Sequence, residues 1–262
     1  MLTKYRCYLL ALLSSVVFSA NGKTNHINEV KLSFIGDKDS QAFMGLKQGI
    51  DEANAQGLFL GQHYLLTKLT NSSTAIFTTV NAKHIAELSK AYPNNVIFNL
   101  TAEDNDLRSD CLPNVLHMTP SQAMKEDAEN QWHKKYTNSL VKAQTWHYTF
   151  KKYAAGQLNS RFTRSTNYKM TDTAWAGWAS VKLLSDSIAR NEFTDTTSIL
   201  KFLKSDLAFD GQKGMSLSFR ETGQLRQPLL LIDNERIAGE APVRGVVNTT
   251  NLDSLGLIHC PK

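Results

Sequence analysis

Recognisable catalytic and metal-binding motifs are absent from this sequence. No Gly-x-Ser-x-Gly elbow, Walker loop, dinucleotide fingerprint or His-Glu-x-x-His pattern occurs. The histidines lack the spacing of metal ligands, in particular His117, His133, His147 and His259. We therefore expect a protein that is not an enzyme, with no catalytic residue and no metal site.

Charge of one sign is not in large excess either. The 262 residues include 29 Lys and Arg against 24 Asp and Glu, a formal net charge of +5. Lys4 and Arg6 belong to the N-terminal segment considered next, and without them the net charge falls to about +3. This balance is typical of an ordinary soluble surface and does not indicate nucleic acid as a partner.

A long apolar run is missing beyond the first twenty residues. The run from Tyr8 to Phe18 follows Lys4 and Arg6 and is interrupted only by two serines. A membrane-spanning helix needs roughly 20 apolar residues. We therefore expect a cleavable signal peptide over residues 1–22, with small residues at the cleavage site, and a periplasmic protein with no membrane span after cleavage.

Strands and helices alternate in the first half of the chain. Apolar residues spaced by three and four predict a helix over 40–56, which Gly57 is expected to end. A second helix is expected over 82–91, and strands over 30–35, 63–69, 75–80 and 96–100. This order is typical of a parallel sheet. Only five residues separate the second strand from the third, too few for a parallel crossover, so these strands should be antiparallel or one of them is not a strand.

The most specific pattern is GQKGMSLSFRETGQLRQPLLL, over 211–231, which predicts a β-hairpin. Residues 215–219 alternate apolar and polar side chains, residues 221–223 supply the turn, and the aliphatic run 229–232 returns as a buried strand. Two late helices are expected, one beginning at Thr171 or Asp172 with Trp175 and Trp178 on its apolar face, and one over 197–203.

This hairpin resembles the closing element of the second lobe in type I periplasmic substrate-binding proteins of ABC transporters. WHYTFKKYAAGQLNSRF (146–162), MTDTAWAGWASVKLL (170–184) and NLDSLGL (251–257) are similar to the branch associated with PQQ-dependent alcohol dehydrogenase systems. The resemblance implies an α/β fold of the type I periplasmic-binding-protein kind, with a Rossmann-like first lobe over 23–120. It also implies an abbreviated second lobe of helices plus a hairpin over 121–240. A C-terminal tail over 241–262 would return to the first lobe.

The second lobe is expected to be truncated because one segment is short. A family member would run through several strand and helix units after residue 119, whereas residues 123–144 form one polar, helix-prone segment. The mature chain of about 240 residues is short for two complete lobes.

Two cysteines remain after signal cleavage, Cys111 and Cys260. An even count in an oxidising compartment, together with the family resemblance, favours a disulfide between them, and two unrelated thiols are the alternative. The bond would close a long loop, worth on the order of 5 kcal/mol in the loop-entropy model.

The candidate ligand site follows the fourth strand. Ligands of doubly wound sheets bind beyond the carboxyl ends of the strands, where the loop 99–108 supplies Asn99, Thr101, Asp104 and Arg108. Arg108 is expected to bind a ligand carboxylate. The alternatives are a solvated polar loop, or an exposed ion pair of Arg108 with Asp104 or Asp106.

PQQ is the bound ligand that the family context suggests. It is a flat quinone with carboxylates, so its site needs arginines and an aromatic plane. Trp175 and Arg226 complete the predicted set of ligand-binding residues, from a group of candidates that also includes Arg161, Arg220 and Trp178. The alternative for both tryptophans is a place in the core.

Three functions are compatible with these patterns. The first is a periplasmic protein that captures a small polar or carboxylated ligand for an ABC permease or a PQQ-dependent alcohol dehydrogenase system. The second is a periplasmic accessory protein of a quinoprotein dehydrogenase that has lost transport. The third is a degenerate paralogue that binds nothing or does not fold.

Overall fold

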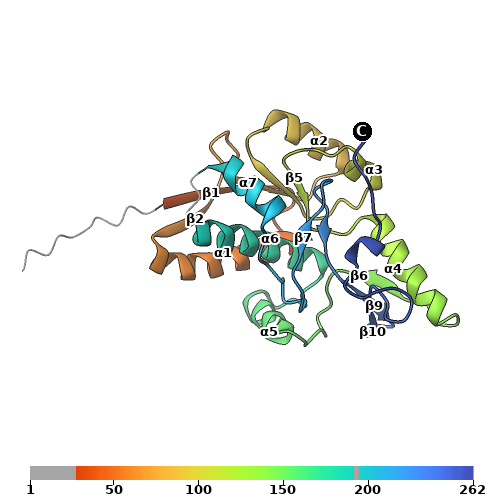
Figure 1. The fold of residues 1–262 in the computed structure, drawn as a ribbon. Coiled ribbons are helices and arrows are strands. Elements are labelled where there is room, and N and C mark those ends of the chain that lie inside the picture. The colour runs from red at the N-terminus through yellow and green to blue at the C-terminus, as the bar shows by residue number, and fades with distance from the viewer. Residues whose placement is uncertain (1–27, 192–194, 262) are drawn as a thin grey trace, which may run out of the picture.

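A five-stranded parallel sheet forms the centre of the computed structural model, which describes residues 28–191 and 195–261 (Figure 1). The strand order is β2-β1-β3-β4-β5, formed by β1 (Asn28–Ile35), β2 (Gln62–Thr67), β3 (Ala75–Thr78), β4 (Val96–Asn99) and β5 (Val115–His117). The four strands expected in the first half are therefore all present. The predicted signal peptide lies outside the described residues.

The expectation that β2 and β3 are antiparallel, or that one of them is not a strand, is wrong. Both run parallel to β1, on its two opposite edges. β2 pairs with residues 28–33 of β1, and β3 pairs with residues 32–35. Because β3 begins where β2 ends, the chain crosses β1 without running back along the sheet. No crossover helix is needed.

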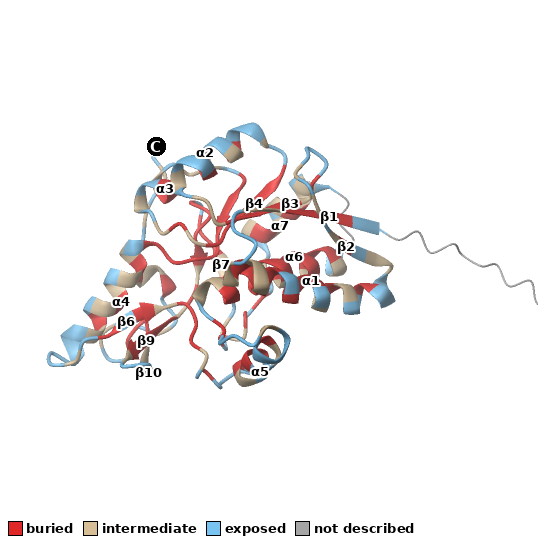
Figure 2. Ribbon diagram, turned by 180° about the vertical axis from the view of Figure 1, so that it is seen from behind, coloured by how far each residue is buried: buried red, intermediate tan, exposed pale blue. Residues whose placement is uncertain are grey.

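Helices cover both faces of this sheet (Figure 2). The helices are α1 (Gln41–Leu60) and α6 (Asp172–Asn191) on one face, joined by α7 (Thr196–Ser205), and α2 (Ala82–Ala91) and α3 (Asn105–Ser109) on the other. Strand side chains alternate between the two faces. Phe77 and Phe98 stack at 5.1 Å within the core beneath α1 and α6, whereas Ile76 and Ile97 belong to the core beneath α2.

The helix α1 continues past Gly57, which was expected to end it. It reaches Leu60, and Gly61 forms the left-handed C-cap with φ 64°. Gly57 is buried where the chain turns back into β2, and a Cβ there would lie 2.3 Å from the carbonyl oxygen of Gln62. The glycine therefore permits a close approach inside the helix.

A second, antiparallel sheet lies beside the first. It has the order β10-β9-β6, formed by β6 (Lys142–Gln144), β9 (Leu229–Asp233) and β10 (Arg236–Ala241), and it packs on α4 (Gln122–Lys135). The predicted helix-prone segment 123–144 thus ends in a strand. The aliphatic run 229–232 is buried as expected, but it is the central strand of this sheet and not the partner of residues 215–219.

The hairpin itself is shorter than expected. β7 (Ser218–Phe219) pairs with β8 (Leu225–Arg226) around the predicted turn. Pro228 separates β8 from β9, and its missing N–H removes a ladder donor there. The turn packs on the edge of the parallel sheet, where the N–H of His117 donates to the carbonyl of Gly223 at 2.8 Å.

The C-terminal tail is attached by a disulfide and by several hydrogen bonds and ion pairs. Cys111 and Cys260 form a disulfide after α3. Arg220 and Arg226 both donate to Oδ1 of Asp253, at 2.9 and 2.8 Å, in the short helix η1 (Leu252–Ser254). The lobe boundaries at residues 22, 120 and 240 stay predictions.

Candidate ligand-binding site

The carboxyl end of β4 carries a buried hydrogen-bond network. Oδ1 of Asn99 accepts from the N–H groups of Thr101 and Ala102, at 3.1 and 2.8 Å. Its Nδ2 donates to the carbonyl of Ala102 at 2.7 Å and lies 3.0 Å from Nδ1 of His117. Asn99 is completely buried. The amide therefore shapes the loop and does not line an open cleft.

Arg108 is buried in the same network. Its Nε donates to Oε1 of Gln224 at 2.9 Å, and its two terminal nitrogens donate to the carbonyl groups of Ala102, Asp104 and Thr119 at 2.7, 3.0 and 3.0 Å. Burial lowers the pKa of Arg108 to about 10, while Asp104 and Glu103 favour the charged form. The guanidinium thus stays charged at neutral pH but is surrounded by its own chain.

This geometry does not favour the predicted contact of Arg108 with a ligand carboxylate, because the side chain has no exposed surface. It also differs from the alternative of an exposed ion pair, since the main chain of Asp104 is the acceptor. Thr101 is half-buried and Asp104 is exposed at the start of α3. Their predicted roles in ligand binding stay predictions.

Trp175 and Arg226 are also engaged within the protein. Trp175 is completely buried, its Nε1 donates to the carbonyl of Gly211 at 3.1 Å, and its ring stacks on Trp146 at 6.0 Å. Nζ of Lys213 lies 4.5 Å from the centre of the same ring. Trp175 therefore occupies the core, as the alternative expectation held, and Arg226 pairs with Asp253.

The residues chosen for PQQ do not fit that ligand. Trp175 offers no exposed aromatic plane and Arg108 no exposed guanidinium. Arg226 is paired with Asp253 of the tail and donates to the carbonyl of Phe219 in the hairpin. We therefore derive no binding step for PQQ from these residues.

A cavity of about 330 Å³, called here the cavity at the sheet junction, lies between the end of β6 in the second sheet and the start of α6, which covers the parallel sheet. Its lining comes from the end of β6, the loop that follows, and the start of α6, namely Gln144, Trp146, His147, Tyr148, Met170, Thr171, Asp172 and Thr173. Oγ1 of Thr171 donates to Oε1 of Gln41 at 2.8 Å. Because Gln41 begins α1 just after the carboxyl end of β1, the cavity lies on the side of the parallel sheet where ligands of such folds bind. Its volume suits a small molecule.

Polar groups and aromatic rings share this cavity. The carboxylate of Asp172 accepts from the N–H of Trp146 at 2.7 Å, and burial raises its pKa despite that bond and the one from Thr145. Burial lowers the pKa of His147, so its imidazole is neutral at neutral pH. The lining thus combines an acidic acceptor, two threonine hydroxyls and apolar ring surfaces, which can bind a small polar ligand.

The sequence patterns pointed to this cavity only in part. Thr171 and Asp172 were considered as helix caps, and Oγ1 of Thr171 does accept from the N–H of Ala174 at 3.5 Å. The aromatic run from Trp146 to Tyr148 was used only for the family resemblance. The signal that marks the site is the polar run Thr171 to Thr173 at a helix start, but only the fold brings it beside residues 144–148.

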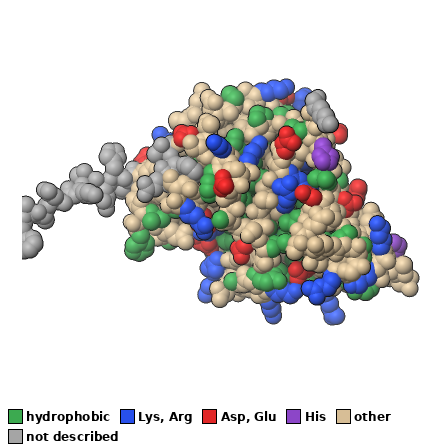
Figure 3. Space-filling model, in the orientation of Figure 1, with side chains coloured by type: hydrophobic (Ala, Val, Ile, Leu, Met, Phe, Trp, Pro, Cys, Tyr) green, Lys and Arg blue, Asp and Glu red, His purple; other side chains and the backbone are tan. Residues whose placement is uncertain are grey.

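Figure 3 shows basic and acidic side chains interspersed over the visible face. Within residues 28–191 and 195–261, no helix has both the length and the apolar character needed to cross a bilayer.

No protein-family model matches the sequence, and no curated protein matches it either. Solved structures do match the fold. A branched chain amino acid ABC transporter periplasmic ligand-binding protein from Burkholderia xenovorans LB400 superposes with a TM-score of 0.68 at 9% identity, covering 80% of this chain and 95% of that one. A periplasmic binding protein from Burkholderia mallei gives 0.65 at 11% identity, covering 85% and 97%.

A leucine binding protein from Thermotoga maritima MSB8 gives a TM-score of 0.64 at 10% identity, covering 80% of this chain and 98% of that one. All three are described as binding proteins. The chain therefore has the mixed α/β fold of the type I periplasmic binding proteins, as the sequence predicted.

Proposed function

We propose that the protein is a periplasmic solute-binding protein that captures a small polar or carboxylated ligand in the cavity between its two sheets. The observation that supports this most is the position of that cavity. Thr171 on its wall is hydrogen-bonded to Gln41, beside the carboxyl end of the first strand. In an α/β sheet this is the edge where ligands bind.

The lining suggests how a ligand is held. The Asp172 carboxylate accepts hydrogen bonds from the polar end of the ligand. The hydroxyls of Thr171 and Thr173 can accept hydrogen bonds from it or donate hydrogen bonds to it. The half-buried ring of Tyr148 provides apolar surface for the rest. Structures of this fold include a substrate-binding protein from Desulfitobacterium hafniense in complex with Leu, so amino acids are among the first ligands to test.

The sequence resemblance supports two destinations for the bound ligand. One is an ABC permease, and the other is a PQQ-dependent alcohol dehydrogenase system. The accessory-protein alternative, in which transport is lost, predicts a dehydrogenase and a cytochrome c among the neighbouring genes, whereas the transport proposal predicts a permease and an ATPase. The proposal includes a second lobe that is shorter than in other members of the family. A cooperative thermal transition of the mature chain would exclude the alternative that the protein does not fold.

A thermal-shift screen of the mature protein tests the proposal. The screen contains leucine, isoleucine, small alcohols and PQQ, and a ligand at 100 times its Kd stabilises the native state by about 2.7 kcal/mol. We expect at least one compound to raise the Tm by several degrees. No shift with any compound in a broader panel of small polar metabolites contradicts the proposal.

A further inference from the structure

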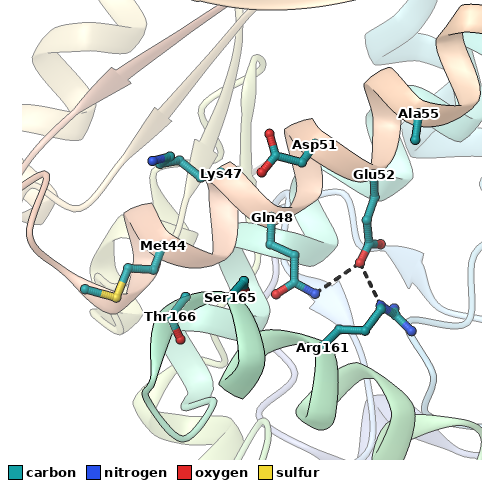
Figure 4. Close-up of a pocket in the computed structure, with 9 residues that line it drawn as sticks. All are labelled: Met44, Lys47, Gln48, Asp51, Glu52, Ala55, Arg161, Ser165 and Thr166. Carbon is teal, nitrogen blue, oxygen red and sulfur yellow. Dashed lines mark hydrogen bonds and ion pairs between the residues drawn. The ribbon is translucent and has the colours of Figure 1, made fainter.

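A cavity of about 520 Å³ lies between α1 and α5 (Ala155–Thr166), away from the cavity at the sheet junction (Figure 4). The two cavities share no lining residue. Binding in one can therefore be tested without depending on the other.

The side chain of Gln48 carries an unsatisfied acceptor in the wall of this cavity. Gln48 is only 7% exposed. Its Nε2 donates to Oε1 of Glu52 at 3.0 Å, whereas its own Oε1 is buried and has no hydrogen-bond partner. In Figure 4 the amide nitrogen faces Glu52 and the oxygen points away from it, toward α5. A buried acceptor without a donor is unfavourable, so this atom calls for a donor from outside the chain.

Glu52 fixes the orientation of that amide. Its Oε1 also accepts from Nε of Arg161 at 3.0 Å, and its Oε2 accepts from Nε1 of Trp178 at 2.9 Å. An ionised carboxylate only accepts hydrogen bonds. Gln48 must therefore turn its NH₂ group toward Glu52, which leaves Oε1 on the other side.

Neighbouring hydroxyls do not supply the missing donor. Oγ of Ser165 and Oγ1 of Thr166 both donate to the carbonyl of Phe162, at 3.1 and 2.7 Å. These two residues line the cavity on the α5 side. Because both hydroxyls donate elsewhere, Oε1 of Gln48 has no donor from either side chain.

Two opposite charges form an exposed part of the cavity lining, called here its mouth. Lys47 and Asp51 lie one turn apart on α1 and are both exposed. Within the part of the chain that the structure describes, neither forms a hydrogen bond or an ion pair, although their spacing permits one. Lys47 is therefore available to an anionic group. Met44 and Ala55 add apolar surface.

We propose that this cavity binds a small molecule carrying a hydrogen-bond donor, a hydroxyl or an amine, beside a carboxylate. The donor engages Oε1 of Gln48 as wall side chains shift to admit it, and Lys47 holds the carboxylate at the mouth. The Glu52 and Arg161 pair keeps the glutamine amide in position. This site is additional to the proposed cleft.

Four compounds with a common skeleton test the chemistry. Phenyllactate and phenylalanine carry both groups, 3-phenylpropionate lacks the donor, and phenethylamine lacks the carboxylate. Binding is followed on the full mature protein by NMR through the indole N–H of Trp178, which is bonded to Glu52 in the wall of this cavity. We expect phenyllactate, phenylalanine or both to bind about tenfold more tightly than either single-group compound.

Variants locate the effect. Gln48→Met removes the acceptor but keeps a side chain of similar length. It should lower the affinity of phenyllactate and phenylalanine to that of 3-phenylpropionate, whose own affinity should stay unchanged. Lys47→Met should weaken the three carboxylates and leave phenethylamine unaffected. Gln122→Met, at an exposed glutamine on α4, is the matched control. Equal affinity for all four compounds, undiminished discrimination in Gln48→Met, or no response of Trp178 to any compound at about 10 mM would overturn the proposal.

Discussion

Nε of Arg108 donates a hydrogen bond of 2.9 Å to Oε1 of Gln224, 116 positions later in the chain. The amide nitrogen of Gln224 in turn donates to the carbonyl of Thr119 at 3.0 Å, which also accepts from Arg108. This contact joins the loop after the fourth strand to the turn of the late hairpin. The arginine thus connects two distant segments inside the protein.

Arg108→Ala should lower the free energy of unfolding by about 3 kcal/mol or more, because three carbonyl groups and Gln224 lose a buried charged donor. Urea unfolding of the mature protein measures this. Arg164→Ala, at an exposed position on α5, should change stability by less than about 0.5 kcal/mol. Unchanged stability with loss of ligand binding in Arg108→Ala would instead support the ligand role first predicted for this residue.

Trp175→Ala should lower the free energy of unfolding by about 3 to 5 kcal/mol, as expected for a large buried aromatic side chain. The ring stacks on Trp146 and contacts Lys213. Tyr168→Ala is the matched control, since that ring is 52% exposed. If Trp175→Ala leaves the melting temperature intact, the core assignment is wrong.

The free energy of unfolding of the protein should rise between pH 7 and pH 9 because of Lys213. Burial lowers its pKa to about 7, despite Asp172 and Glu240, which favour the charged form. In the unfolded chain a lysine has a pKa near 10.4. The unfolded state therefore holds more protons over this range, and the stability gained by pH 9 is about 2 kcal/mol.

The comparison that isolates this effect uses Lys213→Met. The variant leaves the carbonyl groups of Thr145 and Pro228 without their donor, so it is less stable at every pH. Between pH 7 and pH 9, however, the free energy of unfolding of the variant should not show the increase attributed to Lys213. A parallel pH dependence of the two proteins would show that Lys213 stays charged throughout.

The disulfide between Cys111 and Cys260 should be present in the exported protein. Mass spectrometry of a non-reduced digest should show one linked peptide pair, and Cys111→Ser with Cys260→Ser should destabilise the protein by about 3 to 5 kcal/mol. Two thiols that react with an alkylating agent in the native, oxidised protein would contradict this.

Local patterns predicted the elements of the fold better than their partners. The period of α6 put Trp175 and Trp178 on its apolar face, which is buried, although Trp175 was assigned to the ligand site. The aliphatic run of β9 was correctly expected to be buried. The neighbour of β9 could not be predicted, because a run that is apolar on both faces fits any central strand. The stagger of β2 and β3 along β1 likewise has no local signal, since it depends on register.

The predicted site residues show the same limit. Asn99 and Arg108 were correctly expected at the carboxyl edge of the sheet, but composition cannot show whether a polar loop faces solvent or a neighbouring segment. Gln224, far along the chain, determines that outcome for Arg108. The cavity at the sheet junction needs Gln41 and Thr171 side by side, which only the packing of α1 on α6 provides.

The central claim is that a solute binds between the two sheets, and a calorimetric titration tests it most directly. The compound that gives the largest thermal shift is titrated into the mature protein and into Thr171→Val, Thr173→Val and the exposed control Thr197→Val. We expect binding at one site per chain, weakened about tenfold by at least one of the two cavity variants and unchanged in the control. Affinity that is the same in all four proteins would place the ligand elsewhere and contradict the account.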